Sequence, residues 1–348
     1  MRKGAEKLIS GDKLIAFYKS SVTAGRIMAH RNNDEPSKLR EFLDGDLFKG
    51  LLPFLGLIVI LGVMYYLTDG RIMQPKRVRL LLSQVYYPMI VATGVFFVMT
   101  LGSIDFTEGS TLGVASIVIS ELSFYSIPLA ILGGILTGAL IGAVNGFFHV
   151  KFKLQSFIVT ICTMYLFRGV CAYMTTETAI PASASIKALD SDGLKIGITI
   201  AVLVVAYFIF KFTRIGNDVK AVGSGETAAR FSGLRTDKVK FLTFVAAGAL
   251  TGLAAFVNVI KVGSITATAG NQLETQILIS LVLGGLPITG GAKVRFSNIV
   301  VGTLMYTVLN NGLVMLGLEA ATQQLIKGIV FLIFVALTID RKALKVIK

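Results

Sequence analysis

Residues 128–148 read PLAILGGILTGALIGAVNGFF, an apolar run that is long enough to cross a lipid bilayer as one helix. Within it, Gly134, Gly138, Gly142 and Gly146 recur at intervals of four residues. On a helix this spacing gives a stripe of small residues that drifts by only about 40° per step, so a second helix can approach closely. We therefore expect the stripe to serve helix packing, and we favour this over a glycine-lined path.

The chain contains nine further apolar runs, which polar or basic segments separate from one another. They are residues 48–67, 85–101, 111–123, 156–174, 194–210, 241–260, 275–286, 298–314 and 323–338. Of the 348 residues, 54% are hydrophobic and only 16% are charged, whereas a soluble domain has about 25% charged residues. The sequence thus predicts an all-α polytopic membrane protein with about ten transmembrane helices.

The net charge of +14 comes mainly from lysines and arginines between the apolar runs and at both ends of the chain. Positive-inside bias explains this distribution better than nucleic-acid binding. Residues 1–49 show no signal peptide and are interpreted as a basic cytoplasmic extension, either a disordered tail or, around residues 7–21, an amphipathic segment on the lipid surface. Residues 341–348 are predicted to be a cytoplasmic tail. With ten spans and both termini cytoplasmic, the basic segment 68–84 would lie on the extracytoplasmic side, which disagrees with the positive-inside bias.

Motifs for catalysis are missing. The sequence has no G-x-x-x-x-G-K-[ST], H-E-x-x-H or G-x-S-x-G motif and only two histidines. Cys162 and Cys171 lie nine residues apart, about half a helical turn out of phase, and are not expected to form a disulfide. We therefore predict neither an enzyme nor a metal or other cofactor site.

Two pairs of similar segments suggest an internal repeat. Gly102-SIDFTE-Gly109 resembles Gly263-SITATA-Gly270, 161 residues later, and Gly138-ALIGAVN-Gly146 resembles Gly302-TLMYTVLNN-Gly312 at a similar offset. With ten spans, residues 102–109 follow the second span and residues 263–270 follow the seventh, and these two spans cross the membrane in opposite directions. This predicts an inverted repeat of two five-helix halves, as found in many transporters. Chance similarity of glycine-rich segments is the alternative.

Polar side chains inside apolar segments are costly in lipid and usually face the bundle interior or a watery cavity. The candidates for a translocation path are Asp105, Thr107, Glu108, Asn145, Asn310 and Asn311. For Asp105 and Glu108, which lie at a break between apolar runs, we expect a role facing a cavity. For the asparagines, hydrogen bonding between helices is an equal alternative.

The longest polar run in the second half is Gly216–Lys240, GNDVKAVGSGETAARFSGLRTDKVK, between two spans. Its five basic residues place it on the cytoplasmic side. We expect Ser224 to cap a short helix that runs to Ser232, with Gly233 as its stop. So short a helix is marginal in water by itself and needs a surface to lie on. An ordinary solvated loop is the alternative.

Several segments together resemble one family. Glu226-x-Ala228-Ala229-Arg230-x-Ser232-Gly233, preceded by Ala221-Val222-Gly223, is similar to the cytoplasmic loop of the ribose/monosaccharide-type permeases of ABC importers. The segments around Gly142–Gly146, Val282–Gly285 and Leu309–Gly312 also resemble that family. The resemblance covers roughly residues 50–340, which would be the permease domain.

The resemblance implies a permease subunit in a bacterial inner membrane that imports a monosaccharide such as ribose, galactose or xylose. It also implies a second permease subunit, two cytoplasmic ATPase domains and an extracytoplasmic binding protein. Residues 211–240 would be the coupling loop, whose helix docks on the ATPase through Glu226, Ala228, Ala229, Arg230, Phe231, Ser232 and Gly233. Alternative substrates are nucleosides, an autoinducer sugar or branched-chain amino acids, because Glu108 departs from the family pattern. A stand-alone secondary transporter is the alternative from another class.

Overall fold

The computed structural model describes residues 46–338, and the predictions for residues 1–45 and 339–348 lie outside the described residues. The elements run in the order α3 (Asp46–Leu67), η1 (Arg71–Met73), α4 (Pro75–Thr100), α5 (Glu108–Leu122), α6 (Ile127–Lys151), α7 (Ser156–Met174), β1 (Ile180–Pro181), α8 (Ala184–Lys187), α9 (Asp192–Phe212), α10 (Arg214–Ser224), α11 (Glu226–Phe231), α12 (Thr236–Val262), β2 (Ser264–Ile265), α13 (Leu273–Leu283), α14 (Ser297–Met315) and α15 (Ala320–Thr338).

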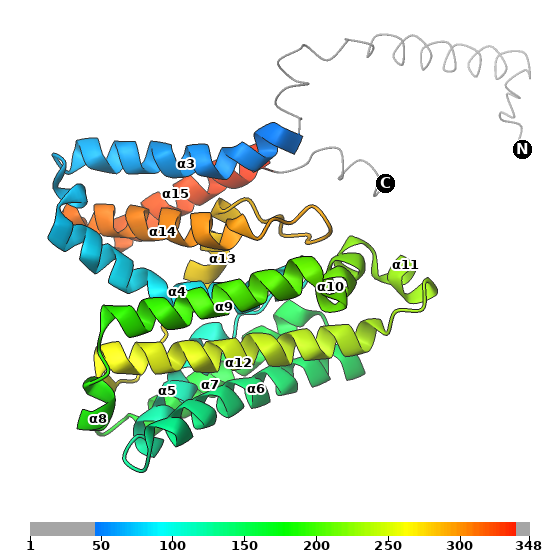
Figure 1. The fold of residues 1–348 in the computed structure, drawn as a ribbon, viewed down its shortest axis with the longest axis horizontal. Coiled ribbons are helices and arrows are strands. Elements are labelled where there is room, and N and C mark those ends of the chain that lie inside the picture. Colours follow the sequence, from blue (N-terminus) through cyan, green and yellow to red (C-terminus); the bar gives the residue numbers. More distant parts are fainter. Residues whose placement is uncertain (1–45, 339–348) are drawn as a thin grey trace, which may run out of the picture. The chain divides into compact units, whose positions relative to one another are not determined.

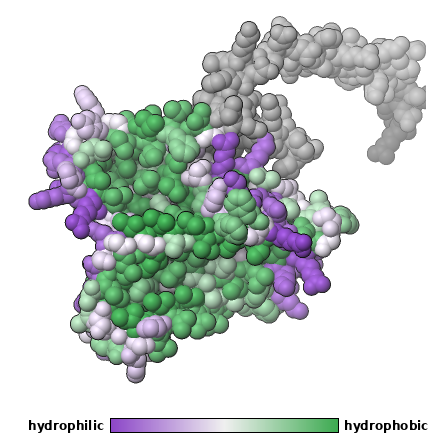
Figure 2. All heavy atoms as spheres, in the orientation of Figure 1, coloured by the Kyte–Doolittle hydropathy of each residue, from purple (hydrophilic) through white to green (hydrophobic). Residues whose placement is uncertain are grey.

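The prediction of an all-α polytopic membrane protein is confirmed. In the described part of the chain, seven helices are long and apolar enough to cross a membrane: α3, α4, α6, α7, α9, α12 and α14. Each of the ten predicted apolar runs overlaps one helix, although the runs 85–101, 111–123 and 275–286 extend past the ends of α4, α5 and α13. α5 and α13 are short, with 15 and 11 residues. Figure 2 shows the consequence, an apolar surface across the middle of the visible face with hydrophilic residues gathered at both ends.

Two predicted helix starts were too late. α4 begins at Pro75 rather than at residue 85, and α12 begins at Thr236 rather than at residue 241. The error came from treating charged residues as loop, although a helix can continue past the apolar core of the bilayer. Much of the basic segment 68–84 is therefore the first turns of α4, where Arg79 pairs with Asp192 of α9 at 2.7 Å.

The helices pack in two similar arrangements. α6 lies along α12, while α4 lies against α14 (Figure 1). Likewise α5 contacts α6 and α12, and α13 contacts α14 and α4. α4 and α12 themselves meet where a Cβ on Gly94 would stand 2.9 Å from the Cα of Ala247. Exchanging α4 with α12, α5 with α13 and α6 with α14 thus reproduces the main contacts.

The glycine stripe of α6 faces α12. A side chain on Gly138 would collide with the carbonyl of Gly248, and one on Gly248 would collide with the carbonyl of Gly138. A Cβ on Gly142 would likewise collide with the carbonyl of Phe244 on α12, and a Cβ on Gly146 would lie 3.1–3.3 Å from Phe241. A Cβ on Gly134 would collide with the side chain of Ile119 on α5 and would lie 3.1 Å from the carbonyl of Gly252. Glycine at these positions lets the two backbones come into direct contact, which is the geometry that small-residue stripes permit in membranes.

The two similar polar breaks meet in space. Gly109 lies in the first turn of α5, just after the break that follows α4, and Gly270 lies in the break that follows α12. A Cβ on either glycine would collide with the carbonyl of the other. Gly270 has φ +70°, a left-handed conformation that favours glycine. Nearby, the strands β1 and β2 pair antiparallel, with Ile180 opposite Ile265.

Candidate functional site

The break between α4 and α5 holds a buried hydrogen-bond network. Asp105 accepts bonds from the amide of Thr107 at 2.8 Å and from its hydroxyl at 2.5 Å. The hydroxyl of Thr107 in turn accepts from Nδ2 of Asn145 at 2.9 Å, and Thr163 of α7 donates to Oδ1 of Asn145 at 2.7 Å. Asp105 and Thr107 are each 2% exposed and Asn145 is 0% exposed. Polar groups from the break, α6 and α7 therefore satisfy each other inside the protein.

Glu108, the first residue of α5, lies beside this network and is 2% exposed. Thr251 of α12 donates a hydrogen bond to its Oε2. Its other oxygen, Oε1, has no hydrogen-bond partner among the described residues. An incompletely satisfied carboxyl group inside a membrane protein is costly and marks a place of functional interest.

Asn310 and Asn311 lie in a different place. Nδ2 of Asn311 donates to Gln84 of α4 at 2.9 Å, and Oδ1 of Asn310 accepts from Lys327 of α15 at 3.1 Å. Asn310 also lines a cavity of about 280 Å³, together with Gln84, Tyr87, Lys261, Gln276, Tyr306 and Thr307. The six path candidates of the sequence therefore do not form one site. Asp105, Thr107 and Asn145 belong to the closed network, with Glu108 beside it. Asn310 lines the polar cavity, and Asn311 bonds to the cavity residue Gln84.

Most cavity residues were missed because each is a single polar or aromatic residue that belongs to no motif. Tyr87, Lys261 and Tyr306 gave no motif, although Gln276 could be noted as a polar residue in an apolar run. Glu274 was missed as well. It is 7% exposed and forms an ion pair at 3.1 Å with Arg168, which joins α7 to α13 next to Gly109. A search for residues just after the second break would have found it.

The polar run between α9 and α12 contains two helices rather than one. α10 covers Arg214–Ser224, and α11 covers only Glu226–Phe231. The prediction that Ser224 caps the short helix is wrong. Ser224 ends α10 and its hydroxyl donates to the carbonyl of Lys220, while Gly225 begins α11 without a side-chain cap. The stop was placed correctly, since Gly233 has φ +89° and follows the helix end.

The side chains of α11 point in two directions. Ala229 is 4% exposed and packs against Leu101, Val219 and Val222. Phe231 is 88% exposed, and Ala228, Arg230, Ser232 and Gly233 are exposed too. Ala229 therefore anchors α11 to the rest of the protein and does not lie on its free face.

Ion pairs fix the orientation of α11. Lys240 of α12 lies 2.5 Å from Oε2 of Glu226, and Arg230 bonds Glu226 at 3.3 Å and Asp237 at 3.2 Å. Partial burial raises the pKa of Glu226, but the hydrogen bond from Lys240 and the charges of Lys240 and Arg230 outweigh this effect, so its pKa lies below the ordinary value of 4.5. Glu226 is thus ionised at neutral pH.

A close backbone contact joins this loop to the end of α4. A side chain on Gly223 of α10 would collide with the carbonyl of Thr100, the last residue of α4. The same carbonyl accepts a bond from the amide of Gly291 at 3.0 Å. Thr100 is followed by Leu101 and then by the break that carries Asp105. α10 thus contacts the end of α4 that leads into the break.

The described part of the chain contains no group of three or more histidine, cysteine or acidic residues that could hold a metal ion. Both cysteines are free, with Cys162 exposed and Cys171 buried.

The chain is similar in sequence to permease proteins of sugar import systems. The chain is 32% identical over 313 residues to the ribose import permease RbsC of Bacillus subtilis, which covers 87% of this chain and 96% of that protein. It is 29% identical over 294 residues to RbsC of Haemophilus influenzae, covering 81% and 90%. It is 27% identical over 286 residues to the D-allose transport system permease AlsC of Escherichia coli, covering 80% and 85%.

No solved structure has a significant similarity to the chain. Residues 78–335 match the family described as "Branched-chain amino acid transport system / permease component". This match contains α5 to α14 complete and all but the first three residues of α4, and with them the polar run between α9 and α12, the buried network and the polar cavity. The chain belongs to this family of membrane transport permeases.

Proposed function

We propose that the chain is the permease subunit of an ATP-driven importer for a monosaccharide, located in a bacterial inner membrane. The observation that carries this proposal is the similarity to the ribose import permease of Bacillus subtilis along 87% of the chain. The names of other relatives agree, since they include a D-allose permease and an L-arabinose permease. ATP hydrolysis takes place on separate ATPase subunits.

The arrangement in the membrane is an inverted repeat of two five-helix halves, α3 to α7 and α9 with α12 to α15. The symmetric contacts of α4 and α12 and the meeting of the two breaks at Gly109 and Gly270 support this arrangement. All ten helices cross the membrane or enter it, and both termini, including residues 1–49 and 341–348, are cytoplasmic. The permease pairs with a second permease subunit, and the pair docks on two ATPase domains and receives substrate from an extracytoplasmic binding protein.

α11 is the coupling helix within residues 211–240. Its exposed residues Ala228, Arg230, Phe231, Ser232 and Gly233 form the contact with the ATPase, while Glu226 and Ala229 hold the helix to α12 and α10. Phe231 inserts into a groove of the ATPase, because a large apolar side chain that is 88% exposed outside the membrane fits a binding role. Closure of the ATPases then moves α11 and α10 together.

The contact of Gly223 with Thr100 passes this motion to α4. Motion of α4 acts at two places. The end of α4 leads into the break with Asp105, Thr107 and Glu108, and the middle of α4 supplies Gln84 and Tyr87 to the polar cavity. The buried network, including Asn145, keeps the break rigid so that α4 moves as one piece with it.

The polar cavity beside Asn310 is the part of the translocation path formed within this chain. Its lining offers amides, hydroxyls and two tyrosine rings from α4, α12, α13 and α14. Hydroxyl-rich solutes match such a lining, because amides and hydroxyls both donate and accept hydrogen bonds. Lys261 is the only ionisable amine among the lining residues, and its ammonium group bonds to the carbonyl of Ser83 at 3.1 Å.

Reconstitution tests the function. Proteoliposomes that contain the permease with its ATPase and binding protein are expected to import radiolabelled ribose, allose or arabinose only when ATP is supplied on the ATPase side. Leaving out the ATPase is expected to abolish uptake. Uptake driven by a proton or sodium gradient without the ATPase would instead indicate a secondary transporter and would overturn the proposal.

A further inference from the structure

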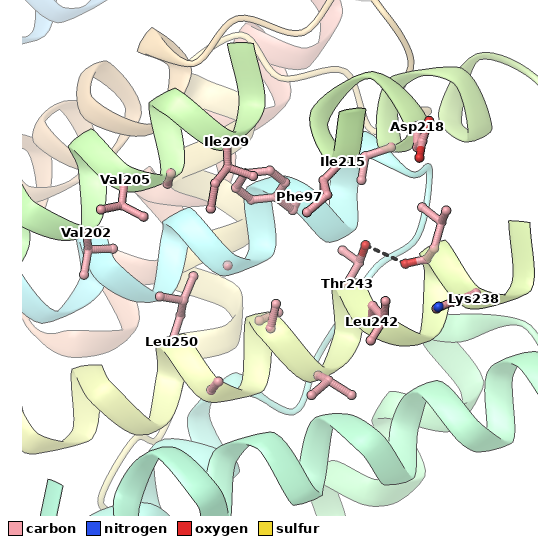
Figure 3. Close-up of a pocket in the computed structure, with 18 of the residues that line it drawn as sticks. Phe97, Val202, Val205, Ile209, Ile215, Asp218, Lys238, Leu242, Thr243 and Leu250 are labelled. Atoms are coloured by element: carbon pink, nitrogen blue, oxygen red, sulfur yellow. Dashed lines mark hydrogen bonds between the residues drawn. The ribbon is translucent and has the colours of Figure 1, made fainter. Parts of the chain in front are cut away.

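A large apolar groove lies between α9 and α12. It has a volume of about 920 Å³ and is distinct from the polar cavity. α9 and α12 each pack on α4 but have few contacts with each other, so α4 forms the floor of the groove through Gly94 and Phe97. The walls are aliphatic and include Val202, Val205 and Leu250 (Figure 3).

One end of the groove is charged. Arg235 and Lys238 line it at the start of α12, and Asp218 lines it from α10. Figure 3 shows Asp218 and Lys238 at one end and Val202 and Leu250 at the other. Neither Arg235 nor Lys238 has an ion-pair partner among the described residues, although the neighbouring Arg230 and Lys240 both do. The three charged lining residues leave one net positive charge.

The length of the groove matches one leaflet. Lys238 and Leu250 are twelve residues apart on α12, which is about 18 Å of helix. Half of a hydrocarbon core is about 15 Å. A chain that lies along the groove from Leu250 therefore ends at the level where the membrane surface begins, and this is where the two unpaired basic residues stand.

We propose that this groove binds one anionic phospholipid of the adjacent leaflet. An acyl chain lies along the aliphatic walls, and the phosphate of the headgroup contacts Arg235 and Lys238. Charge complementarity selects the anionic headgroup, because each basic residue at the membrane surface adds to the binding free energy for anionic lipids. The N-terminal end of α12 adds a positive partial charge at the same position.

The occupied groove affects the coupling loop. Gly233 and Leu234, which lie between α11 and α12, line the groove beside Arg235. Ile215 and Val219 of α10 line it as well. A lipid in the groove thus contacts both helices of the loop and stabilises their position against α12. This inference rests on the membrane location of the chain and does not require the proposed substrate.

Native mass spectrometry of the full-length chain, released from mixed vesicles of phosphatidylglycerol and phosphatidylcholine, tests the proposal. The wild type is expected to retain one phosphatidylglycerol in preference to phosphatidylcholine. The double variant Arg235→Gln/Lys238→Gln is expected to lose about thirtyfold in affinity for phosphatidylglycerol, about fivefold for each charge. The control Lys76→Gln/Arg77→Gln removes the same charge from the exposed start of α4 and is expected to retain the lipid.

A second variant tests the apolar part. Ala246 is exposed and lines the groove, so Ala246→Phe fills it and is expected to reduce retention of both lipids. Leu140→Phe on α6, where Leu140 is 66% exposed, is the matched control and leaves retention unchanged. Retention at the wild-type level in both test variants, or equal losses in the controls, would overturn the proposal. So would a photo-cross-linker at Val205→Cys that reacts with a second copy or with residues 1–45 instead of lipid.

Discussion

Phe231→Ala is expected to weaken binding of the permease to its ATPase without destabilising the permease itself. Phe231 is 88% exposed and ends α11, so its removal leaves no cavity in this chain. Burial of a phenylalanine side chain removes about 150–250 Å² from water, which is worth about 4–6 kcal/mol at about 25 cal/mol per Å². Since burial at an interface is incomplete, we expect a loss of about 2–4 kcal/mol, or about 30- to 1,000-fold in affinity for the ATPase.

The assay measures binding of the purified ATPase to the permease in nanodiscs, together with the thermal unfolding of the permease alone. Phe231→Ala is expected to weaken binding and to leave the unfolding temperature unchanged. Phe124→Ala is the matched control, because Phe124 is 62% exposed but lies in the turn between α5 and α6. ATPase affinity at the wild-type level in Phe231→Ala, or an equal loss in Phe124→Ala, would refute the reasoning.

Three further predictions concern packing, the cavity and pH. Gly138→Ala is expected to destabilise the permease by about 1–3 kcal/mol, because its methyl group meets the carbonyl of Gly248, as thermal unfolding in detergent would show. Asn310→Ala is expected to lower the rate of ATP-driven sugar uptake about tenfold through the loss of one hydrogen-bonding group in the cavity. Because the pKa of Glu226 lies below 4.5, its bond to Lys240 stabilises α11 above that pH and is lost as the pH falls through the folded-state pKa, which hydrogen exchange of α11 would report.

A control or a contradicting result is defined for each of these three predictions. Gly169→Ala is the control for packing, since a methyl group there meets no atom within 4 Å, and similar losses in both variants would refute close contact as the cause. Uptake by Asn310→Ala at the wild-type rate would remove the cavity from the path. Glu226→Gln is expected to abolish the acid-dependent change in exchange, and an unchanged pH profile in that variant would contradict the ion pair.

The sequence was informative where a single physical requirement dominates. A bilayer needs long apolar helices, so every predicted run lies mostly within one helix. The glycine stripe also pointed to close approach, and the structure places Gly138 directly against Gly248 of α12. Which helix lies opposite could not be read from the sequence, since any helix with small residues would have met the same requirement.

Structure that depends on contacts distant in the sequence could not be predicted. α10 was read as loop because its apolar residues are few and lie among glycines and charges. Its apolar residues Val219 and Val222 are buried against Leu101 at the end of α4, and this tertiary contact stabilises the helix. In the same way, the pair between Glu226 and Lys240 joins residues fourteen positions apart on different helices.

The candidate site was predicted as a set of residues and not as an arrangement. Asp105, Thr107 and Asn145 stood out as polar residues in apolar surroundings, but their mutual hydrogen bonds depend on how α6 and α7 cover the break. Asn310 has the same sequence signal and yet faces a cavity. Polarity alone does not distinguish a satisfied buried group from one that lines a path.

The central claim is that α11 contacts the ATPase, and site-directed cross-linking tests it most directly. In a Cys162→Ser background, which removes the exposed native thiol, a photo-cross-linker is attached at Phe231→Cys in the assembled transporter and, as a control, at Tyr125→Cys. We predict that the label at position 231 reacts with the ATPase and that the label at position 125 does not. A label at position 231 that never reaches the ATPase, in a complex that still imports sugar, would contradict the account.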